Sequence, residues 1–227
     1  MPKYRCYECS EHDFICPACR AAELARLAQA CIPERYANKS IETDYSVSTA
    51  EQKKSLDVAK RFIEKFGIES EQFGEMLVFL GGYGTGKTLL ATLILQAIAP
   101  KHGGLYIEAA QIIQSIRRSW RTNSPVTDME LIAHYVNQAV LVVDEVGAQY
   151  GTKGEQRILE AVLGPRYAHL KPTIIATNCT HDELKLILGN KIIDRMDEIA
   201  TWVPFTWKSY RQPWKKKGRS HDTRRSY

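Results

Sequence analysis

The stretch GGYGTGKT, residues 81–88, combines residue types that bind phosphate. Glycine accepts backbone angles that other residues avoid and lets a phosphate approach the main chain closely. We predict that the amides of this loop contact a nucleoside triphosphate, that Lys87 reaches its β and γ phosphates, and that the Thr88 hydroxyl binds magnesium. The alternative is a chance glycine turn. The predicted nucleotide-contacting residues are Gly82, Tyr83, Gly84, Thr85, Gly86, Lys87, Thr88 and Leu89.

Two carboxylates, Asp144 and Glu145, end the apolar run AVLVVDE. At the carboxyl end of a parallel strand they would lie beside the phosphate loop. Asp144 could then hold magnesium together with Thr88, and Glu145 could orient or activate water. Alternatively, the two acids only cap the following helix.

An asparagine, Asn178, ends the next apolar run, PTIIATN. Its amide would lie within reach of the γ phosphate and of the attacking water, which it could polarise without a change of charge. By itself an asparagine at a strand end is more often a turn residue, but the two preceding motifs favour the catalytic interpretation.

Four of the six cysteines form two C-x-x-C pairs near the N-terminus. Each pair can present two thiolates to one tetrahedral zinc ion, and the six residues between the pairs allow the chain to fold back. Such a site has no open position for a substrate, so that its role would be structural. An iron–sulfur cluster, mixed ligation with His12 and free thiols are the alternatives. The predicted zinc ligands are Cys6, Cys9, Cys16 and Cys19.

Short apolar runs alternate with helical sequence along most of the chain. The first, residues 75–80, leads into the glycine loop, which a helix then leaves. Near-continuous apolar strands that alternate with helices indicate a parallel sheet covered on both faces. We therefore predict an α/β fold with a five-stranded parallel sheet between helices. The other strands are expected at residues 104–110, 139–145, 172–178 and 201–207.

The composition fits one globular domain with a small addition at an end, since 44% of the 227 residues are hydrophobic and 25% are charged. The longest apolar run, residues 89–99, is too short to cross a bilayer and contains Thr92 and Gln96. The N-terminus has no hydrophobic region of the signal-peptide type. We predict a cytoplasmic protein that does not contact a membrane.

Positive charge is concentrated at the C-terminus. Residues 208–227 contain eight Lys or Arg and one acid, a net charge of +7, so that the total of +5 leaves −2 for the rest of the chain. This segment either binds phosphates through salt-dependent contacts or is only a solvated tail.

These features divide the chain into three segments. A helix after the cysteine cluster, with Leu24, Leu27 and Ala28 on one face, is expected to end near Pro33, and a capping box of Ser48 and Glu51 is expected to start the next helix. We predict an N-terminal zinc module that docks a partner (1–47), an ATPase domain (48–208) and a flexible basic tail (209–227).

From about Ala59 to Arg211 the sequence resembles the bacterial replicative helicase loaders of the DnaC and DnaI type, which are AAA+ ATPases. The resemblance implies an AAA+ core without an α-helical lid, and hence weak intrinsic turnover that assembly stimulates. Loaders of the DnaI type also carry an N-terminal zinc domain, although the cysteine spacing here matches only loosely. The stretches that carry the resemblance are GGYGTGKT, LVVDEVGAQ, PTIIATN, IIDRM and TWKSYR.

Further roles follow from this resemblance. Asn178 corresponds to the sensor 1 residue, and Arg195 to an arginine finger that reaches a neighbouring subunit's nucleotide; a surface ion pair with Asp194 or Glu198 is the alternative for Arg195. The family often has a further arginine where this chain has Lys191. In the loaders the region after the second strand contacts single-stranded DNA, and here it offers cations beside a ring, which could also be an ordinary packed aromatic. The predicted DNA-contacting residues are Arg117, Arg118, Trp120 and Arg121.

The function implied is ATP-dependent loading of the hexameric replicative DNA helicase onto single-stranded DNA, with ATP, Mg²⁺ and Zn²⁺ as cofactors and ATP acting as a switch. The main alternative is an ATPase that helps DNA transposition, of the IstB type. A small-molecule kinase would need an acceptor lid and an arginine-rich phosphate clamp. A zinc-dependent binding module with ATP as a structural ligand would tolerate Glu145→Gln.

Overall fold

The computed structural model describes residues 17–69, 74–148 and 151–211. In these residues five parallel strands form one sheet in the order β2-β3-β4-β1-β5, which confirms the predicted sheet. The strands lie close to the expected positions: β1 (Met76–Gly81), β2 (Leu105–Glu108), β3 (Leu141–Val146), β4 (Thr173–Thr177) and β5 (Ala200–Phe205).

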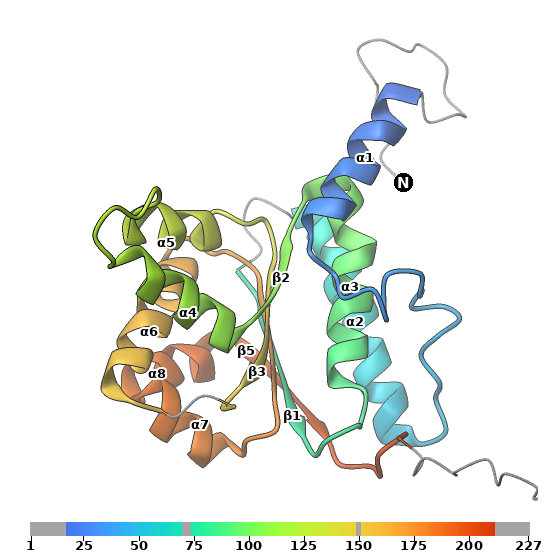
Figure 1. Ribbon diagram of the computed structural model, residues 1–227. Coiled ribbons are helices and arrows are strands. Elements are labelled where there is room, and N and C mark those ends of the chain that lie inside the picture. The colour runs from blue at the N-terminus through green and yellow to red at the C-terminus, as the bar shows by residue number, and fades with distance from the viewer. Residues whose placement is uncertain (1–16, 70–73, 149–150, 212–227) are drawn as a thin grey trace, which may run out of the picture.

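The central strands are buried on both faces because helices cover both sides of the sheet (Figure 1). Along β1, Leu77 and Phe79 belong to the core on one face, whereas Met76 and Val78 belong to the core on the other. Successive side chains of a strand point to opposite faces, so that a strand with two covered faces must be apolar throughout.

Eight helices surround the sheet in the described residues. Helices α2 and α3 pack on one face, with α1 against α3 on that side, and the other five lie on the opposite face (Figure 1). They are α1 (Pro17–Gln29), α2 (Ala50–Glu69), α3 (Lys87–His102), α4 (Ala109–Ser119), α5 (Asp128–Val136), α6 (Lys153–Ala168), α7 (His181–Leu188) and α8 (Asn190–Ile199). None of these helices is long and apolar enough to span a membrane.

The segment between α1 and α2 is part of the main core. The Arg26 side chain donates to the Pro100 carbonyl at 2.8 Å, and the amide of Tyr106 donates to the Ala30 carbonyl at 2.8 Å. Ile41 and Tyr45 are buried in the cluster that includes α2 and α3. The domain boundary at residue 47 stays a prediction, but residues 30–45 pack into the same core as α2 and α3.

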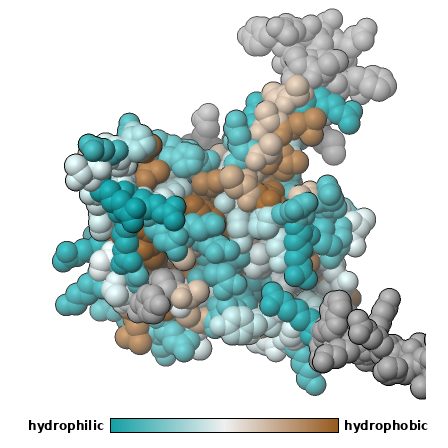
Figure 2. Space-filling model, viewed as in Figure 1, coloured by the Kyte–Doolittle hydropathy of each residue, from teal (hydrophilic) through white to brown (hydrophobic). Residues whose placement is uncertain are grey.

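The far half of α1 projects beyond this core, and Figure 2 shows hydrophobic side chains along it. Leu24 is 60% exposed, whereas Leu27 packs against the core. The helix ends at Gln29, four residues before Pro33. Its expected apolar face is therefore only partly covered by the rest of the chain.

The capping box at the start of α2 lies one residue later than the sequence predicts. The amide of Gln52 donates to Thr49 Oγ1 at 3.3 Å, and the amide of Thr49 donates to Gln52 Oε1 at 3.0 Å. This reciprocal pair has the usual form of a capping box, so that Thr49 and Gln52 fill the roles expected for Ser48 and Glu51.

Helix α6 is anchored to the sheet by Arg166, whose side chain is fully buried. Its guanidinium donates to the carbonyls of Tyr135, Val136, Gln138 and Pro172, and its Nε donates to Thr173 Oγ1 at 2.9 Å. Burial lowers the pKa of Arg166 to about 9, so that it is still charged at neutral pH. A buried charge that is fully hydrogen-bonded keeps α6 at a defined position relative to β3 and β4.

Candidate functional site

The glycine loop joins β1 to α3. Gly84 and Gly86 have left-handed backbone angles, with φ of 73° and 98°. A Cβ at position 84 would also lie 2.1 Å from the Ser209 hydroxyl oxygen, so that only glycine fits there. Thr85 closes the turn, because its hydroxyl donates to the Gly82 carbonyl at 2.9 Å. The loop ends at the N-terminus of α3, which has no side-chain cap, and its first amides can therefore bind an anion.

Lys87 is the first residue of α3, and its side chain is hydrogen-bonded at the end of the sheet. Its Nζ donates to the carbonyls of Gly81 and Gly82 at 2.6 and 2.7 Å and to Asn178 Oδ1 at 2.7 Å. Burial lowers the pKa of Lys87, and the carboxylates of Glu145 and Asp144 in β3 partly oppose this effect. Because an ammonium has three donors, a phosphate that binds Lys87 must replace one of these acceptors.

The predicted acids lie at an irregularity of β3. Its register with β4 shifts between Val143 and Val146, and Glu145 has a left-handed φ of 52°. Such a backbone is costly for a residue with a side chain, and bulges of this kind re-aim side chains next to active sites. Asp144 is buried and accepts hydrogen bonds from the Tyr106 hydroxyl at 2.7 Å and from the Glu145 amide at 2.8 Å.

Asn178 connects the lysine to the second acid. Its Nδ2 donates to Glu145 Oε2 at 3.2 Å, while its Oδ1 accepts from Lys87. Burial raises the pKa of Glu145, Asp144 raises it further, and Lys87 opposes the shift. A carboxylate with a raised pKa is a better proton acceptor near neutral pH than an ordinary glutamate.

A second wall of the site, which the sequence analysis missed, comes from the segment between α1 and α2. Arg35, Lys39 and Tyr45 line the cavity that also contains Lys87. Asp44 fixes the bend of this segment, since it accepts from Lys39 Nζ at 3.0 Å and from the backbone amide of residue 40 at 2.9 Å. These contacts lower the pKa of Asp44 to about 2. No motif in the sequence indicated the segment.

The residues after β5 complete this second wall. Trp207 Nε1 donates to the Thr85 carbonyl at 2.9 Å, and the Tyr210 amide donates to the Gly84 carbonyl at 2.8 Å. Arg211, the last described residue, lines the cavity. The start of the predicted tail is therefore attached to the phosphate loop. The only sequence signal for it was the stretch TWKSYR, which was assigned no role in nucleotide binding.

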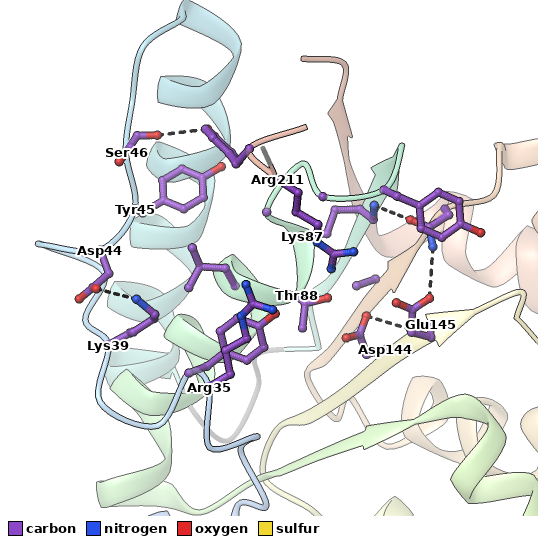
Figure 3. A pocket seen from close by; sticks show the side chains of 18 residues that line it. Arg35, Lys39, Asp44, Tyr45, Ser46, Lys87, Thr88, Asp144, Glu145 and Arg211 are labelled. Atoms are coloured by element: carbon purple, nitrogen blue, oxygen red, sulfur yellow. Dashed lines mark hydrogen bonds and ion pairs between the residues drawn. The ribbon is translucent and has the colours of Figure 1, made fainter. Parts of the chain in front are cut away.

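The two walls enclose a cavity of about 730 Å³, open to solvent and large enough for a nucleotide (Figure 3). Figure 3 shows Arg35 and Arg211 extending into it between the 35–46 segment and the acids of β3. The structure therefore brings five predicted residues together around one space: Lys87, Thr88, Asp144, Glu145 and Asn178. Tyr83, Gly84, Gly86 and Leu89 line it as well, whereas Gly82 and Thr85, which are hydrogen-bonded to each other, do not.

The donor set suits a magnesium ion. The Thr88 hydroxyl and the Asp144 carboxylate both face the cavity (Figure 3), and hard oxygen ligands are what Mg²⁺ prefers. Among the described residues no group of three or more His, Cys, Asp or Glu could hold a metal by itself. The protein offers two ligands, so that substrate phosphates and water would have to provide the remaining ones.

Arg195 lies outside this cavity. It is half-buried on α8, and its guanidinium carbon lies 5.2 Å from the centre of the Tyr167 ring on α6. In the described part of the chain it forms no ion pair, either with Asp194 or with Glu198. The contact with a neighbouring subunit that is expected of Arg195 stays a prediction.

The predicted DNA-contacting residues lie at the far end of α4. Arg118, Trp120 and Arg121 are at the surface, and Trp120 is 58% exposed, with its Nε1 donating to Asp128 at 3.3 Å. Arg117 differs from them, because it forms an ion pair of 3.2 Å with the buried Glu155 of α6. Trp120 is therefore not a packed core aromatic, and Arg117 has a structural partner.

The predicted zinc site lies outside the described residues. Cys6, Cys9 and Cys16 precede them, and only the backbone of Cys19 is described, within α1. Zinc binding stays a prediction from the spacing of the cysteines.

Comparison with known proteins identifies related sequences. The family described as IstB-like ATP binding protein matches residues 23–218. The replicative helicase loader DnaC of Buchnera aphidicola subsp. Schizaphis graminum (strain Sg) is 31% identical over 189 residues, which cover 82% of this chain and 74% of that protein. The replicative helicase loader DnaC of Escherichia coli (strain K12) is 31% identical over 170 residues, which cover 74% of this chain and 67% of that protein.

Comparison with solved structures agrees. A crystal structure of the DnaC helicase loader superposes with a TM-score of 0.67 and 25% sequence identity, over 76% of this chain and 99% of that one. The family match, residues 23–218, contains all five strands and every residue that lines the cavity.

Proposed function

This chain belongs to the family of IstB-like ATP binding proteins, and from that membership we propose that it is an ATPase that loads the replicative DNA helicase onto single-stranded DNA in the cytoplasm. The observation that carries this proposal is the 31% identity over 82% of the chain to a relative named a replicative helicase loader. The cavity supports it, because its residues suit the binding and hydrolysis of a nucleoside triphosphate.

Lys87 and the amides at the start of α3 bind the phosphates. Arrival of the γ phosphate displaces Asn178 from Lys87, while Asn178 keeps its bond to Glu145. The position of the Asn178 amide then depends on whether the γ phosphate is present. This linkage is the step that would make the nucleotide a switch.

Glu145 and Asn178 act on the attacking water. Glu145 accepts the proton while the water oxygen forms a bond to the γ phosphorus, and the bond from that phosphorus to the β–γ bridging oxygen breaks, so that ADP and phosphate are released. Thr88 and Asp144 would hold magnesium, which neutralises charge on the phosphates. The raised pKa of Glu145 favours its role as proton acceptor.

Arg195 provides a cation for the transferred phosphoryl group of a neighbouring subunit's nucleotide, that is, in trans. An arginine finger stabilises charge on the transferred phosphoryl group, and its supply by a neighbour makes hydrolysis dependent on assembly. The absence of Arg195 from the cavity of its own subunit, in the residues the structure describes, supports this assignment. Weak turnover of the isolated subunit is then expected.

The remaining parts of the chain would serve the partners. The N-terminal module with α1, whose exposed Leu24 lies on the projecting half of the helix, would dock the helicase, and Cys6, Cys9, Cys16 and Cys19 would hold the zinc that folds it. Trp120 with Arg118 and Arg121 offers stacking and charge to single-stranded DNA.

The proposal is tested by the mass of the full chain mixed with the replicative helicase of its host, measured by light scattering after gel filtration, with and without ATP. A complex is expected, together with release of single-stranded-DNA-bound helicase on hydrolysis. A matched variant in which the four cysteines are serine should lose about one zinc per chain and the complex together. Absence of a complex under every nucleotide condition would exclude the loader and direct the search to duplex DNA and a transposase, as for the IstB type.

A further inference from the structure

The side chain of Arg195 packs against helix α6, where its guanidinium lies over the ring of Tyr167. The guanidinium carbon lies 5.2 Å from the ring centre, within the range of a cation–π contact. The next residue back along α6, Arg166, is buried and fully hydrogen-bonded, so that this part of the helix is firmly attached to the sheet. Tyr167 therefore offers Arg195 a stationary surface.

Gly164 of α6 lies next to the same guanidinium. It lies in the interior of α6, it is buried, and its φ is not in the left-handed region, so that its backbone does not require glycine. A Cβ at this position would lie 3.2 Å from Arg195 Nη1, which is the one atom within 4 Å of it apart from the adjacent residues and the backbone of the same helix. Glycine is among the least favourable residues in a helix interior. The space that it leaves is occupied by the guanidinium.

The hydroxyl of Tyr167 is hydrogen-bonded to an acid of α8. It donates a hydrogen bond to Glu198 Oε2, and this bond raises the pKa of Tyr167. Glu198 lies three residues after Arg195 on α8, a spacing at which opposite charges on a helix usually pair. With its carboxylate held by Tyr167, Glu198 does not pair with Arg195 among the described ion pairs.

Lys191, a second cation at the contact between α8 and α6, differs from Arg195 because it is paired with an acid. Lys191, four residues before Arg195 on α8, forms an ion pair of 2.5 Å with Glu160 of α6. One contact between α8 and α6 is thus a neutralised ion pair, whereas the other leaves the cation without an acidic partner in the described part of the chain. A guanidinium already bound to a carboxylate would have to break that pair before it could bind a phosphate.

We propose that Tyr167 and Gly164 form a seat that positions Arg195, extended and not neutralised, for the nucleotide of a neighbouring subunit. The inference rests on the proposed function, in which Arg195 acts in trans. Tyr167 and Gly164 are positioning residues in this scheme, since they act only through Arg195. Tyr167 supplies a surface that holds the cation without neutralising it, and Gly164 supplies the room.

The first experiment measures ATPase rate against protein concentration for the full chain and its variants. Arg195→Ala should abolish the concentration-dependent rise. Tyr167→Leu should lower the rate at high concentration roughly tenfold, because small misplacements of a transition-state group are costly. Gly164→Ala should lower it while the melting temperature is unchanged or higher, since alanine favours the helix. Lys191→Ala, which breaks the neighbouring ion pair, is the matched control and should retain most of the rate.

Mixing variants separates positioning from a general structural defect. A Lys87→Ala subunit binds ATP too weakly to hydrolyse it but carries an intact Arg195 with Tyr167 and Gly164. It should therefore restore hydrolysis at Tyr167→Leu sites as it does at Arg195→Ala sites. Recovery of both supports the seat. If only Arg195→Ala is rescued, Tyr167 serves its own subunit's fold and the inference is wrong. If Arg195→Ala itself keeps the full rate, the trans finger of the proposed function is wrong instead.

The hydroxyl is tested by Tyr167→Phe, which keeps the ring but releases Glu198. The concentration-dependent rate should fall, and the double variant Tyr167→Phe with Glu198→Gln should recover it, because glutamine cannot neutralise Arg195. An unchanged rate in Tyr167→Phe, or a double variant as slow as the single one, would overturn the role of the hydroxyl.

Discussion

The cavity has two walls of different origin. One is built from strand ends: Lys87 after β1, Asp144 and Glu145 in β3, and Asn178 after β4. The other comes from irregular segments, residues 35–46 between two helices and residues 207–211 after the last strand. The strand-end wall is connected side chain to side chain from Lys87 to Glu145. In the irregular wall, residues 207–211 are attached to the loop through the backbone carbonyls of Gly84 and Thr85.

The two walls differ in the chemistry that their side chains can perform. In the strand-end wall, hydrogen bonds join Lys87 to Asn178 and Asn178 to Glu145. Burial lowers the pKa of Lys87 and raises the pKa of Glu145, as expected for a reacting centre. The irregular wall adds cations, Arg35 and Arg211, that are exposed at the surface. We therefore expect substitutions in the strand-end wall to abolish ATP binding or hydrolysis. Substitutions in the irregular wall should weaken ATP binding only partly.

The largest effect is expected for Lys87→Ala. Loss of the phosphate-binding cation should weaken ATP binding roughly a hundredfold or more, because charge-assisted bonds to phosphate are among the strongest polar contacts. Isothermal titration calorimetry measures this, with Lys153→Ala, an exposed lysine at the start of α6, as the control. Normal affinity in Lys87→Ala would contradict the assignment of the loop.

Next in size is Glu145→Gln, which should keep ATP binding and reduce kcat roughly a hundredfold, the usual contribution of a general base. Single-turnover hydrolysis with bound ATP measures this directly. A variant that hydrolyses at the normal rate would show that the proton goes elsewhere.

The same variant tests the pH dependence. Since the pKa of Glu145 is raised above its ordinary 4.5, the wild-type rate should fall as the pH decreases through that raised value, and Glu145→Gln should lack this decrease. A carboxyl with a raised native pKa favours the folded state below its ordinary pKa, and this contribution is lost as the pH rises through the raised value. Glu145→Gln should accordingly be more stable than the wild type at neutral pH, which a thermal melt can check.

A smaller effect is expected in the second wall for Arg211→Ala. Arg211 lies close enough to Lys87 and Glu145 to influence the pKa values of both, so that it should contact the phosphates. Loss of one charged contact should weaken ATP binding roughly tenfold. Lys208→Ala, three residues earlier and outside the cavity, is the control. Equal ATP affinities in the two variants would show that Arg211 does not contact the nucleotide.

The smallest effect is expected for Arg35→Ala. Arg35 is exposed at the edge of the cavity, and a solvated cation contributes less than a buried one. Nucleotide affinity should fall about threefold, consistent with a weak surface charge interaction, and the decrease should diminish as salt is added. Lys53→Ala, an exposed lysine on α2, provides the comparison. A tenfold or larger loss would place the second wall on a par with the first.

Several features could be predicted from the sequence because they depend on local order. The apolar runs gave strands close to their observed positions, and the parallel sheet then required that its carboxyl ends meet at one edge. The phosphate-loop motif and this rule together predicted that Lys87, Glu145 and Asn178 lie at one site. The displaced capping box shows the limit of local signals, since Thr49 and Gln52 fit the same pattern as Ser48 and Glu51.

The sequence by itself determined the strand-end wall, because a phosphate loop and residues at strand ends are fixed in space by the rules of a parallel sheet. Only the tertiary structure decided the rest. Segments without periodicity, such as residues 35–46 and 207–211, take their course from whatever surface they pack against, and no local pattern specifies that surface. The same holds for the contact of Arg195 with Tyr167 and Gly164. This contact depends on how α6 and α8 pack together, and the sequence of each helix alone does not specify which residues of the two helices meet.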